Sequence, residues 1–106
     1  MKKSSIPNPK SPLDERAAAQ VAELFRAFSD TSRVRLIAAL AEGELNVGAL
    51  AELAGISESA VSHHMRGLRQ MRLVRARKEG RQVYYSLDDD HVVALFRQGL
   101  EHVRHG

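Results

Sequence analysis

The stretch ALAELAGISESAVSHHMRGLRQ, residues 49–70, constrains the fold of this chain more than any other. Its apolar spacing predicts a short helix over about 47–54, with Leu50 and Leu53 facing inward, and a second helix over roughly 58–70. Gly55, Ile56 and Ser57 form a tight turn between them, and Ser57 is the expected N-cap of the second helix. Two helices joined by so short a turn predict a helix-turn-helix motif.

The second helix has two faces of different character. Its apolar face consists of Val61, Met65 and Leu68. The opposite face carries short donors and one long basic side chain, namely Ser59, Ser62, His63 and Arg66. A helix that enters the major groove of DNA needs short side chains for close approach and donors for phosphates and base edges, and Arg66 can reach a phosphate or a guanine. This face therefore predicts a DNA-reading helix.

After Met71 the apolar period changes from helical to alternating. Two strands are predicted over 72–78 and 81–87, joined at Glu79 and Gly80, with Val83, Tyr85 and Leu87 on one side of the second strand. Seven of the 16 Lys and Arg residues lie between positions 66 and 81, and only Glu79 opposes them there. Such a patch favours nucleic acid over a merely solvated surface, and the hairpin fits a wing along the DNA backbone.

The remaining elements complete a single domain over residues 13–106. Residues 1–12 are polar, basic and Pro-rich, which predicts a disordered arm. A first helix begins near Leu13, and its apolar face consists of Val21, Leu24, Phe25 and Phe28. Asp30 or Thr31 caps a second helix that stops at Gly43, and a last helix runs from about Asp89 to the C-terminus. The predicted fold is mainly α with a β-hairpin, a winged helix-turn-helix.

The run from Phe25 to His105 closely resembles the ArsR/SmtB family of bacterial winged-helix repressors, with ISESAVSHHMRGL as its most specific segment. The resemblance implies a homodimer built from the first and last helices, which binds a palindromic operator in double-stranded DNA and releases it when an inducer binds. It also places DNA contacts on a set of residues in the motif and the wing: Ser57, Ser59, Ser62, His63, Arg66, Lys78 and Arg81.

The absence of cysteine narrows the chemistry. Many members of that family place a cysteine in the short helix, where this chain has Asn46, so the sequence argues against arsenite, lead and cadmium sites that require thiolate. No nucleophile–base pair, paired carboxylates or phosphate loop is recognisable, so no enzyme activity is predicted. Without a signal peptide or long apolar run, we expect a cytoplasmic protein with no membrane partner.

The last helix carries metal-binding residue types at both ends. Asp89 and His91 lie at its start and His102 and His105 at its end, a nitrogen and oxygen donor set suited to Zn²⁺, with Co²⁺ as the alternative ion. His91 and His102 are eleven residues apart, which is roughly 16 Å along a helix axis. Because bonds to zinc are only about 2 Å long, one helix cannot bring all four ligands to one ion.

An antiparallel pair of these helices, related by a two-fold axis, removes that difficulty. Asp89 and His91 of one subunit would then meet His102 and His105 of its partner, which gives two equivalent sites per dimer. Apolar residues between the tips would form the helix contact: Val92, Leu95, Phe96, Gly99 and Val103. Some members of the resembling family carry a zinc site with this Asp-x-His…His-x-x-His pattern, which this chain matches at all four positions.

Other interpretations of these residues stay open. Asp89 could simply cap the last helix, and the two C-terminal histidines could be ordinary surface residues. The sequence therefore predicts a zinc-responsive repressor, with two alternatives. One is a winged-helix repressor that answers to a non-metal inducer or to none, and the other is a histidine-based metal buffer with an incidental basic surface.

Overall fold

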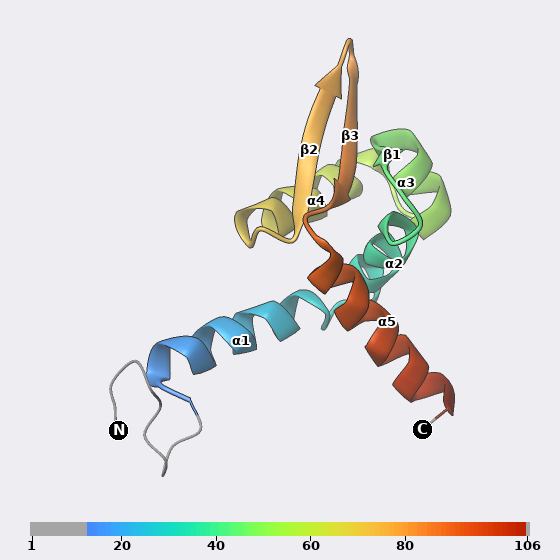
Figure 1. The fold of residues 1–106 in the computed structure, drawn as a ribbon. Helices are drawn as coiled ribbons and strands as arrows, with labels where there is room; N and C mark the ends of the chain where they lie inside the picture. The colour runs from blue at the N-terminus through green and yellow to red at the C-terminus, as the bar shows by residue number, and fades with distance from the viewer. Residues whose placement is uncertain (1–12, 106) are drawn as a thin grey trace.

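The computed structural model describes residues 13–105, and the predicted arm over residues 1–12 lies outside them. The helices in chain order are α1 (Glu15–Ala27), α2 (Thr31–Leu40), α3 (Val47–Ala54), α4 (Glu58–Gln70) and α5 (Asp90–His105). The strands are β1 (Leu45–Asn46), β2 (Val74–Glu79) and β3 (Gln82–Leu87). Figure 1 shows the β2–β3 hairpin projecting from one end of the fold, while α1 and α5 extend from the other. The predicted winged helix-turn-helix is confirmed.

The small sheet has the strand order β1-β3-β2, and both pairings are antiparallel. The hairpin loop is Gly80-Arg81, one residue later than predicted, and Gly80 supplies the left-handed backbone at φ 62°. Strand β1 was not predicted, since its two residues have no period to recognise. It pairs Leu45 with Tyr85 and Asn46 with Tyr84, so it attaches the hairpin to the start of α3.

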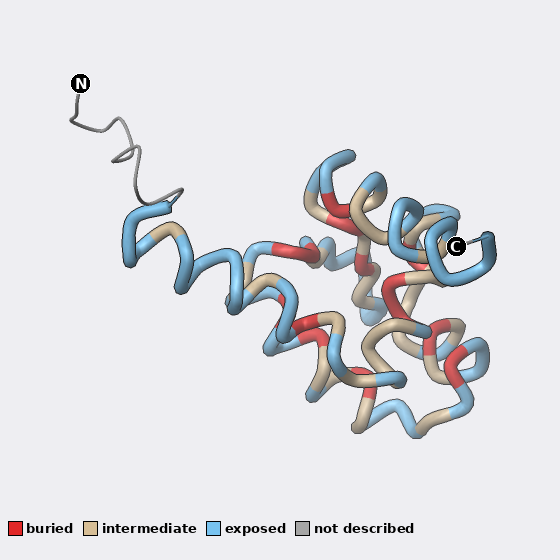
Figure 2. The backbone as a smooth tube through the Cα atoms, turned by 90° about the horizontal axis from the view of Figure 1, so that it is seen from below, coloured by how far each residue is buried: buried red, intermediate tan, exposed pale blue. Residues whose placement is uncertain are grey.

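One buried core joins α2, α3, α4 and the sheet. Buried residues are coloured red in Figure 2. Its fully buried large side chains are Leu36, Ile37, Leu50, Val61, Met65 and Leu68. The predicted apolar face of α4 is therefore confirmed. Helix α1 contributes little to this core within one chain, because Ala27 is its only buried residue while Val21 and Phe25 are 42% and 53% exposed. The first helix thus presents an unburied apolar face.

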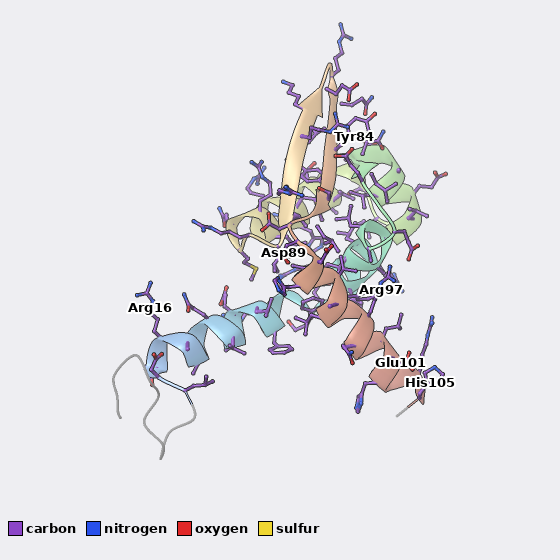
Figure 3. The ribbon with its side chains drawn as sticks, viewed as in Figure 1. Arg16, Tyr84, Asp89, Arg97, Glu101 and His105 are labelled. Atoms are coloured by element: carbon purple, nitrogen blue, oxygen red, sulfur yellow. The ribbon has the colours of Figure 1, made fainter. Side chains whose placement is uncertain are left out.

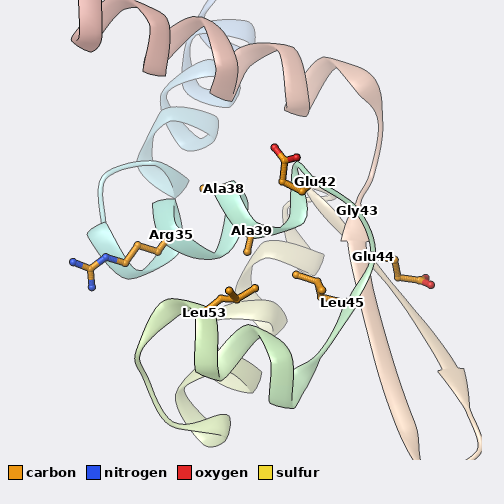
Figure 4. Close-up of a pocket in the computed structure, with 8 residues that line it drawn as sticks. All are labelled: Arg35, Ala38, Ala39, Glu42, Gly43, Glu44, Leu45 and Leu53. Atoms are coloured by element: carbon orange, nitrogen blue, oxygen red, sulfur yellow. The ribbon is translucent and has the colours of Figure 1, made fainter.

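The prediction that Leu53 faces inward is wrong. Leu50 and Ala54 form the buried side of α3, whereas Leu53 is 64% exposed. Leu53 borders an open hollow between α2 and α3, together with Ala38, Ala39 and Leu45 (Figure 4). A short helix buries only a narrow stripe, and residues 50 and 54, one turn apart, already fill it.

The junction between α4 and β2 also differs from the prediction. The strand begins at Val74 rather than at Arg72, because Arg72 adopts a left-handed conformation with φ 62°. The N–H of Arg72 donates to the carbonyl of Arg69 and the N–H of Leu73 donates to the carbonyl of Leu68, both at 2.9 Å. These two bonds define a Schellman motif, in which the left-handed position is usually glycine.

No helix within residues 13–105 combines the length and the apolar character needed to cross a lipid bilayer.

Candidate nucleic-acid interface and metal ligands

The turn between α3 and α4 is fixed by local backbone chemistry. Gly55 ends α3 in a left-handed conformation, with φ 71°. Ser57 caps α4, since its hydroxyl oxygen accepts a hydrogen bond from the N–H of Ala60 at 3.1 Å. The hydroxyl groups of Ser57 and Ser59 lie 3.2 Å apart. Ser57 therefore has a structural role in the turn.

The outer face of α4 is available to a ligand. Ser59, His63 and Arg66 are exposed, and Ser62 is half-buried between them and the core. The ring of His63 meets that of His64 edge-on, with centroids 5.9 Å apart. Because α4 buries its opposite face completely at Val61, Met65 and Leu68, its orientation relative to the core is well defined.

The hairpin separates its basic residues into two groups. Lys78 and Arg81 lie at the exposed tip, and neither side chain forms a hydrogen bond or ion pair with another residue between 13 and 105. Arg77, by contrast, donates two hydrogen bonds to Glu44, from Nε at 3.0 Å and from Nη2 at 2.8 Å. Arg77 also contacts Glu79 and lies over the ring of Tyr84, 4.8 Å from its centroid. The tip is thus free to bind phosphate, while Arg77 holds the hairpin to the body.

Glu79 is the only acidic residue between positions 66 and 81, but two acidic residues outside this range also pair with its arginines. Glu44 pairs with Arg77, and the carboxylate of Asp88 lies 3.7 Å from Nε of Arg75. The side-chain hydrogen bonds from Arg77 lower the pKa of Glu44, and the same pairing raises the pKa of Arg77. Glu44 and Arg77 are 33 residues apart, so no local pattern could have revealed this contact.

Asp89 lies immediately before α5 and caps it. Its Oδ1 atom accepts hydrogen bonds from the N–H groups of His91 at 2.9 Å and Val92 at 3.1 Å. The bond from Val92, followed by the bond from His91, holds the pKa of Asp89 below its usual value. The side chain of His91 is 97% exposed, with Nδ1 3.6 Å from the same Asp89 oxygen. The capping role of Asp89, left open by the sequence, is present in the structure.

His102 and His105 lie at the far end of α5, and both are exposed. Nε2 of His105 is 3.7 Å from Oε2 of Glu101, the nearest carboxylate. Figure 3 shows Asp89 and His105 at opposite ends of the helix. Within residues 13–105, the chain alone gathers no group of three or more His, Asp or Glu side chains that could hold an ion. The four candidate ligands therefore form two separate pairs in one subunit.

A groove of about 530 Å³ lies between the apolar sides of α1 and α5. Its lining includes Phe25 and Phe28 from the α1 segment, and Leu95, Gly99 and Val103 from α5. Val103 is 76% exposed, and a β-carbon added at Gly99 would meet no atom within 4 Å. The expectation that Val92 joins this surface is wrong, because Val92 is buried in the core of its own chain. The other four predicted contact residues line the groove.

Comparisons with known proteins agree with the winged helix-turn-helix fold. Residues 30–76 match the family described as "Bacterial regulatory protein, arsR family". The chain is 53% identical over 87 residues to the transcriptional repressor SmtB homolog of Synechocystis sp., an alignment that covers 82% of this chain and 66% of the relative. It is 41% identical over 96 residues to a cadmium resistance transcriptional regulatory protein, a CadC homolog of Staphylococcus aureus, with 90% and 79% of the two chains covered.

A solved structure shows the same fold. The homodimeric winged helix-turn-helix DNA-binding domain Mb0332 from Mycobacterium bovis superposes with a TM-score of 0.75 and 31% identity. The superposition covers 90% of this chain and 94% of that domain.

Proposed function

This chain belongs to the arsR family of bacterial regulatory proteins and is not an enzyme, and from that premise we propose that it is a zinc-responsive transcriptional repressor. The metal-free homodimer binds a palindromic operator through α4 and the hairpin. Zinc bound between the two α5 helices lowers the affinity for that DNA. The observation that carries the proposal is the division of four exposed ligands into two pairs at opposite ends of one helix.

The DNA-binding part rests on exposed donors. Ser59, Ser62, His63 and Arg66 face outward from a helix that is fixed by its buried side, and Ser57 lies at its N-terminus. Lys78 and Arg81 occupy the tip of the hairpin without an acidic partner in the described part of the chain. Helix donors read base edges, and the wing cations contact phosphates.

The homodimer is supported by the unburied apolar sides of α1 and α5. Phe25, Val21 and Val103 are all more than 40% exposed, and the groove between the helices has an apolar lining. A two-fold partner would cover both helices and place its own α5 antiparallel to the first. Mb0332, which shares this fold, is a homodimer.

The donor set favours zinc among effectors. Asp89, His91, His102 and His105 offer one carboxylate and three imidazoles, which suit Zn²⁺ or Co²⁺ in a tetrahedral arrangement. These four residues fit a zinc ion because all of them are exposed. The capping hydrogen bonds to Asp89 occupy Oδ1 alone, which leaves Oδ2 for the ion. The relative from Staphylococcus aureus is named for cadmium resistance, but this chain has no thiolate to offer cadmium. A bound ion would supply a charged bridge between subunits.

The coupling of zinc to DNA is the direct test of the sensor. Zinc should favour a dimer geometry in which the two α4 helices no longer match successive major grooves, so zinc and DNA weaken each other's binding reciprocally. Fluorescence anisotropy with the DNA upstream of the chain's own coding sequence measures this effect. Unchanged affinity at saturating zinc would contradict the sensor but favour the repressor with another inducer. Failure to prefer that DNA over random duplex would favour the metal buffer.

A mixing experiment tests whether each zinc lies between subunits. One variant carries Asp89→Ala and His91→Ala, and the other carries His102→Ala and His105→Ala. Each homodimer lacks half of the ligands at both sites, whereas the mixed dimer rebuilds one complete site. We expect about one tightly bound zinc per mixed dimer and none in either parent. Dimerisation of each variant is measured first, and mixed dimers without zinc would rule out the shared site.

A further inference from the structure

An open pocket of about 330 Å³ lies where α1, α2 and α4 meet, beside the outer face of α4. Basic groups from all three helices line it: Arg26 of α1, Arg33 of α2, and His63, His64 and Arg66 of α4. His63 and Arg66 also belong to the proposed DNA-reading face. The pocket therefore continues that face onto α2, which is outside both the helix-turn-helix and the wing.

Acidic side chains offset only part of this charge. Glu23 also lines the pocket, and it pairs with Arg26 at 2.7 Å. Asp30 caps α2 by accepting a hydrogen bond from the N–H of Ser32 at 2.8 Å, and its charge acts on His64 and Arg33 without a direct ion pair. One acidic group is thus occupied by a neighbouring arginine and the other by the backbone.

Arg33 and Arg66 keep their donors available. Neither guanidinium forms a hydrogen bond or ion pair with any residue between 13 and 105, although Arg33 is half-buried. A partly desolvated guanidinium gains most from an anion that accepts two of its N–H groups at once, and phosphate oxygens have the spacing for this. Gly67 adjoins the pocket and leaves open space where a side chain would stand.

We propose that Arg33 binds a backbone phosphate of the DNA at the edge of the groove that α4 enters, with Arg66 completing the same pocket. The inference rests on the proposed function and adds a contact from α2. Phosphates flank every groove and carry no sequence information directly. The contact therefore strengthens binding to all duplexes and sets the position of α4, while base-edge contacts choose the sequence.

The experiment measures affinity for the upstream DNA and for random duplex between 50 and 200 mM salt. The variants are Arg33→Ala, Arg33→Lys and a matched control, Arg35→Ala. Arg35 lies on the same helix but lines the hollow on the α3 side (Figure 4). Each neutralised phosphate contributes about 0.9 to the slope of log affinity against log salt, so loss of two contacts per dimer should flatten the slope by about 1.8. Between 50 and 200 mM salt the affinity of each protein for DNA falls by some factor, and this factor should be about 12 times smaller for Arg33→Ala than for the wild type.

Arg33→Lys should keep most of the slope, since its charge remains, and Arg35→Ala should match the wild type. Circular dichroism and thermal unfolding of each variant show that the fold is retained. Equal slopes for Arg33→Ala and Arg35→Ala would overturn this inference while leaving the proposed function intact. If the wild type binds no DNA in a salt-dependent manner, both fail.

A free phosphate ligand is distinguished by a separate titration. Inorganic phosphate is added to DNA-free protein at constant ionic strength, and the amide signal of Gly67 is followed by NMR. A DNA-backbone site predicts no saturation at millimolar phosphate, because one isolated anion lacks the other contacts of the duplex. Saturable binding that disappears in Arg33→Ala would assign the pocket to a small phosphate compound and overturn the DNA contact.

Discussion

Replacing Arg72 with glycine should stabilise the protein, although it removes one of the seven basic residues between positions 66 and 81. Arg72 occupies the left-handed position of the Schellman motif that ends α4, with φ 62°. A side chain in this conformation costs roughly 1–2 kcal/mol. Glycine removes that cost but makes the unfolded chain more flexible, at roughly 0.5–1 kcal/mol. The net gain in the free energy of unfolding should be about 0.5–1 kcal/mol.

For a domain of this size, that gain corresponds to a rise in Tm of about 2–8 °C. Urea denaturation and thermal unfolding at one fixed protein concentration measure it, because dimerisation would otherwise change the apparent stability. Two controls separate the backbone effect from the loss of charge. Arg72→Ala loses the charge but keeps the β-carbon, so it should not gain stability. Arg69→Gly places glycine in the last turn of α4 and should cost roughly 0.5–1 kcal/mol.

The expected gain in stability comes from backbone strain at Arg72 alone. If Arg72→Gly is no more stable than Arg72→Ala, then the left-handed conformation of Arg72 is not the source of the effect. If Arg69→Gly stabilises the protein equally, removal of positive charge from this segment explains both results.

Two further changes test the core and the hairpin. Leu50→Ala should lower the free energy of unfolding by about 2–5 kcal/mol because Leu50 is fully buried. Leu53→Ala, at an exposed site, should change it by less than about 0.5 kcal/mol. Equal losses of stability in urea denaturation would contradict this burial pattern. Glu44→Gln should speed amide hydrogen exchange in β2 and β3 and weaken DNA binding. The pKa of Glu44 is lowered in the folded protein, so its ion pair with Arg77 stabilises the fold fully when the pH is above the ordinary pKa of glutamate. This stabilisation is lost as the pH falls through the lowered pKa. Glu44→Gln should lack this pH dependence when amide hydrogen exchange is measured across the acid range.

The parts of the fold that the sequence predicted correctly depend on local signals. Ser57 was predicted as a cap, and Asp30 was one of two candidates with Thr31, because a side-chain oxygen before an apolar helix satisfies free N–H groups within three residues. Helix α4 was bounded correctly because its buried positions recur with the helical period. These signals act between residues that are neighbours along the chain, so they can be read without knowing the fold.

Apart from the shifted strand start at Arg72 and the shifted hairpin loop, which are local, the errors arose where distant segments meet. Leu53 and Val92 each lie on an apolar stripe, but which part of a stripe is buried depends on the neighbouring elements. Strand β1 exists only because β3 provides an edge for it, and Glu44 holds Arg77 across the sheet. The pocket around Arg33 likewise requires α1, α2 and α4 to converge. For the metal ligands, the sequence predicted the two pairs at the ends of one helix, and their joining stays a prediction about two subunits.

The two interpretations of Asp89, as helix cap and as metal ligand, are compatible in this structure. Both capping hydrogen bonds, from His91 and Val92, reach Oδ1. A carboxylate has about four acceptor positions over two oxygens, so Oδ2 can bind an ion while the cap persists. A substitution that keeps one function and removes the other tests this arrangement.

Asp89→Asn is that substitution, because asparagine caps helices about as well as aspartate but presents a neutral amide to an ion. It should retain the helicity of α5 seen by circular dichroism and weaken zinc binding measured with a competing chelator. Asp89→Ala removes both oxygens, so it should lose helicity at the start of α5 as well as zinc affinity. If Asp89→Asn binds zinc as tightly as the wild type, the carboxylate is a cap alone. The remaining His91, His102 and His105 would then have to hold the ion without it.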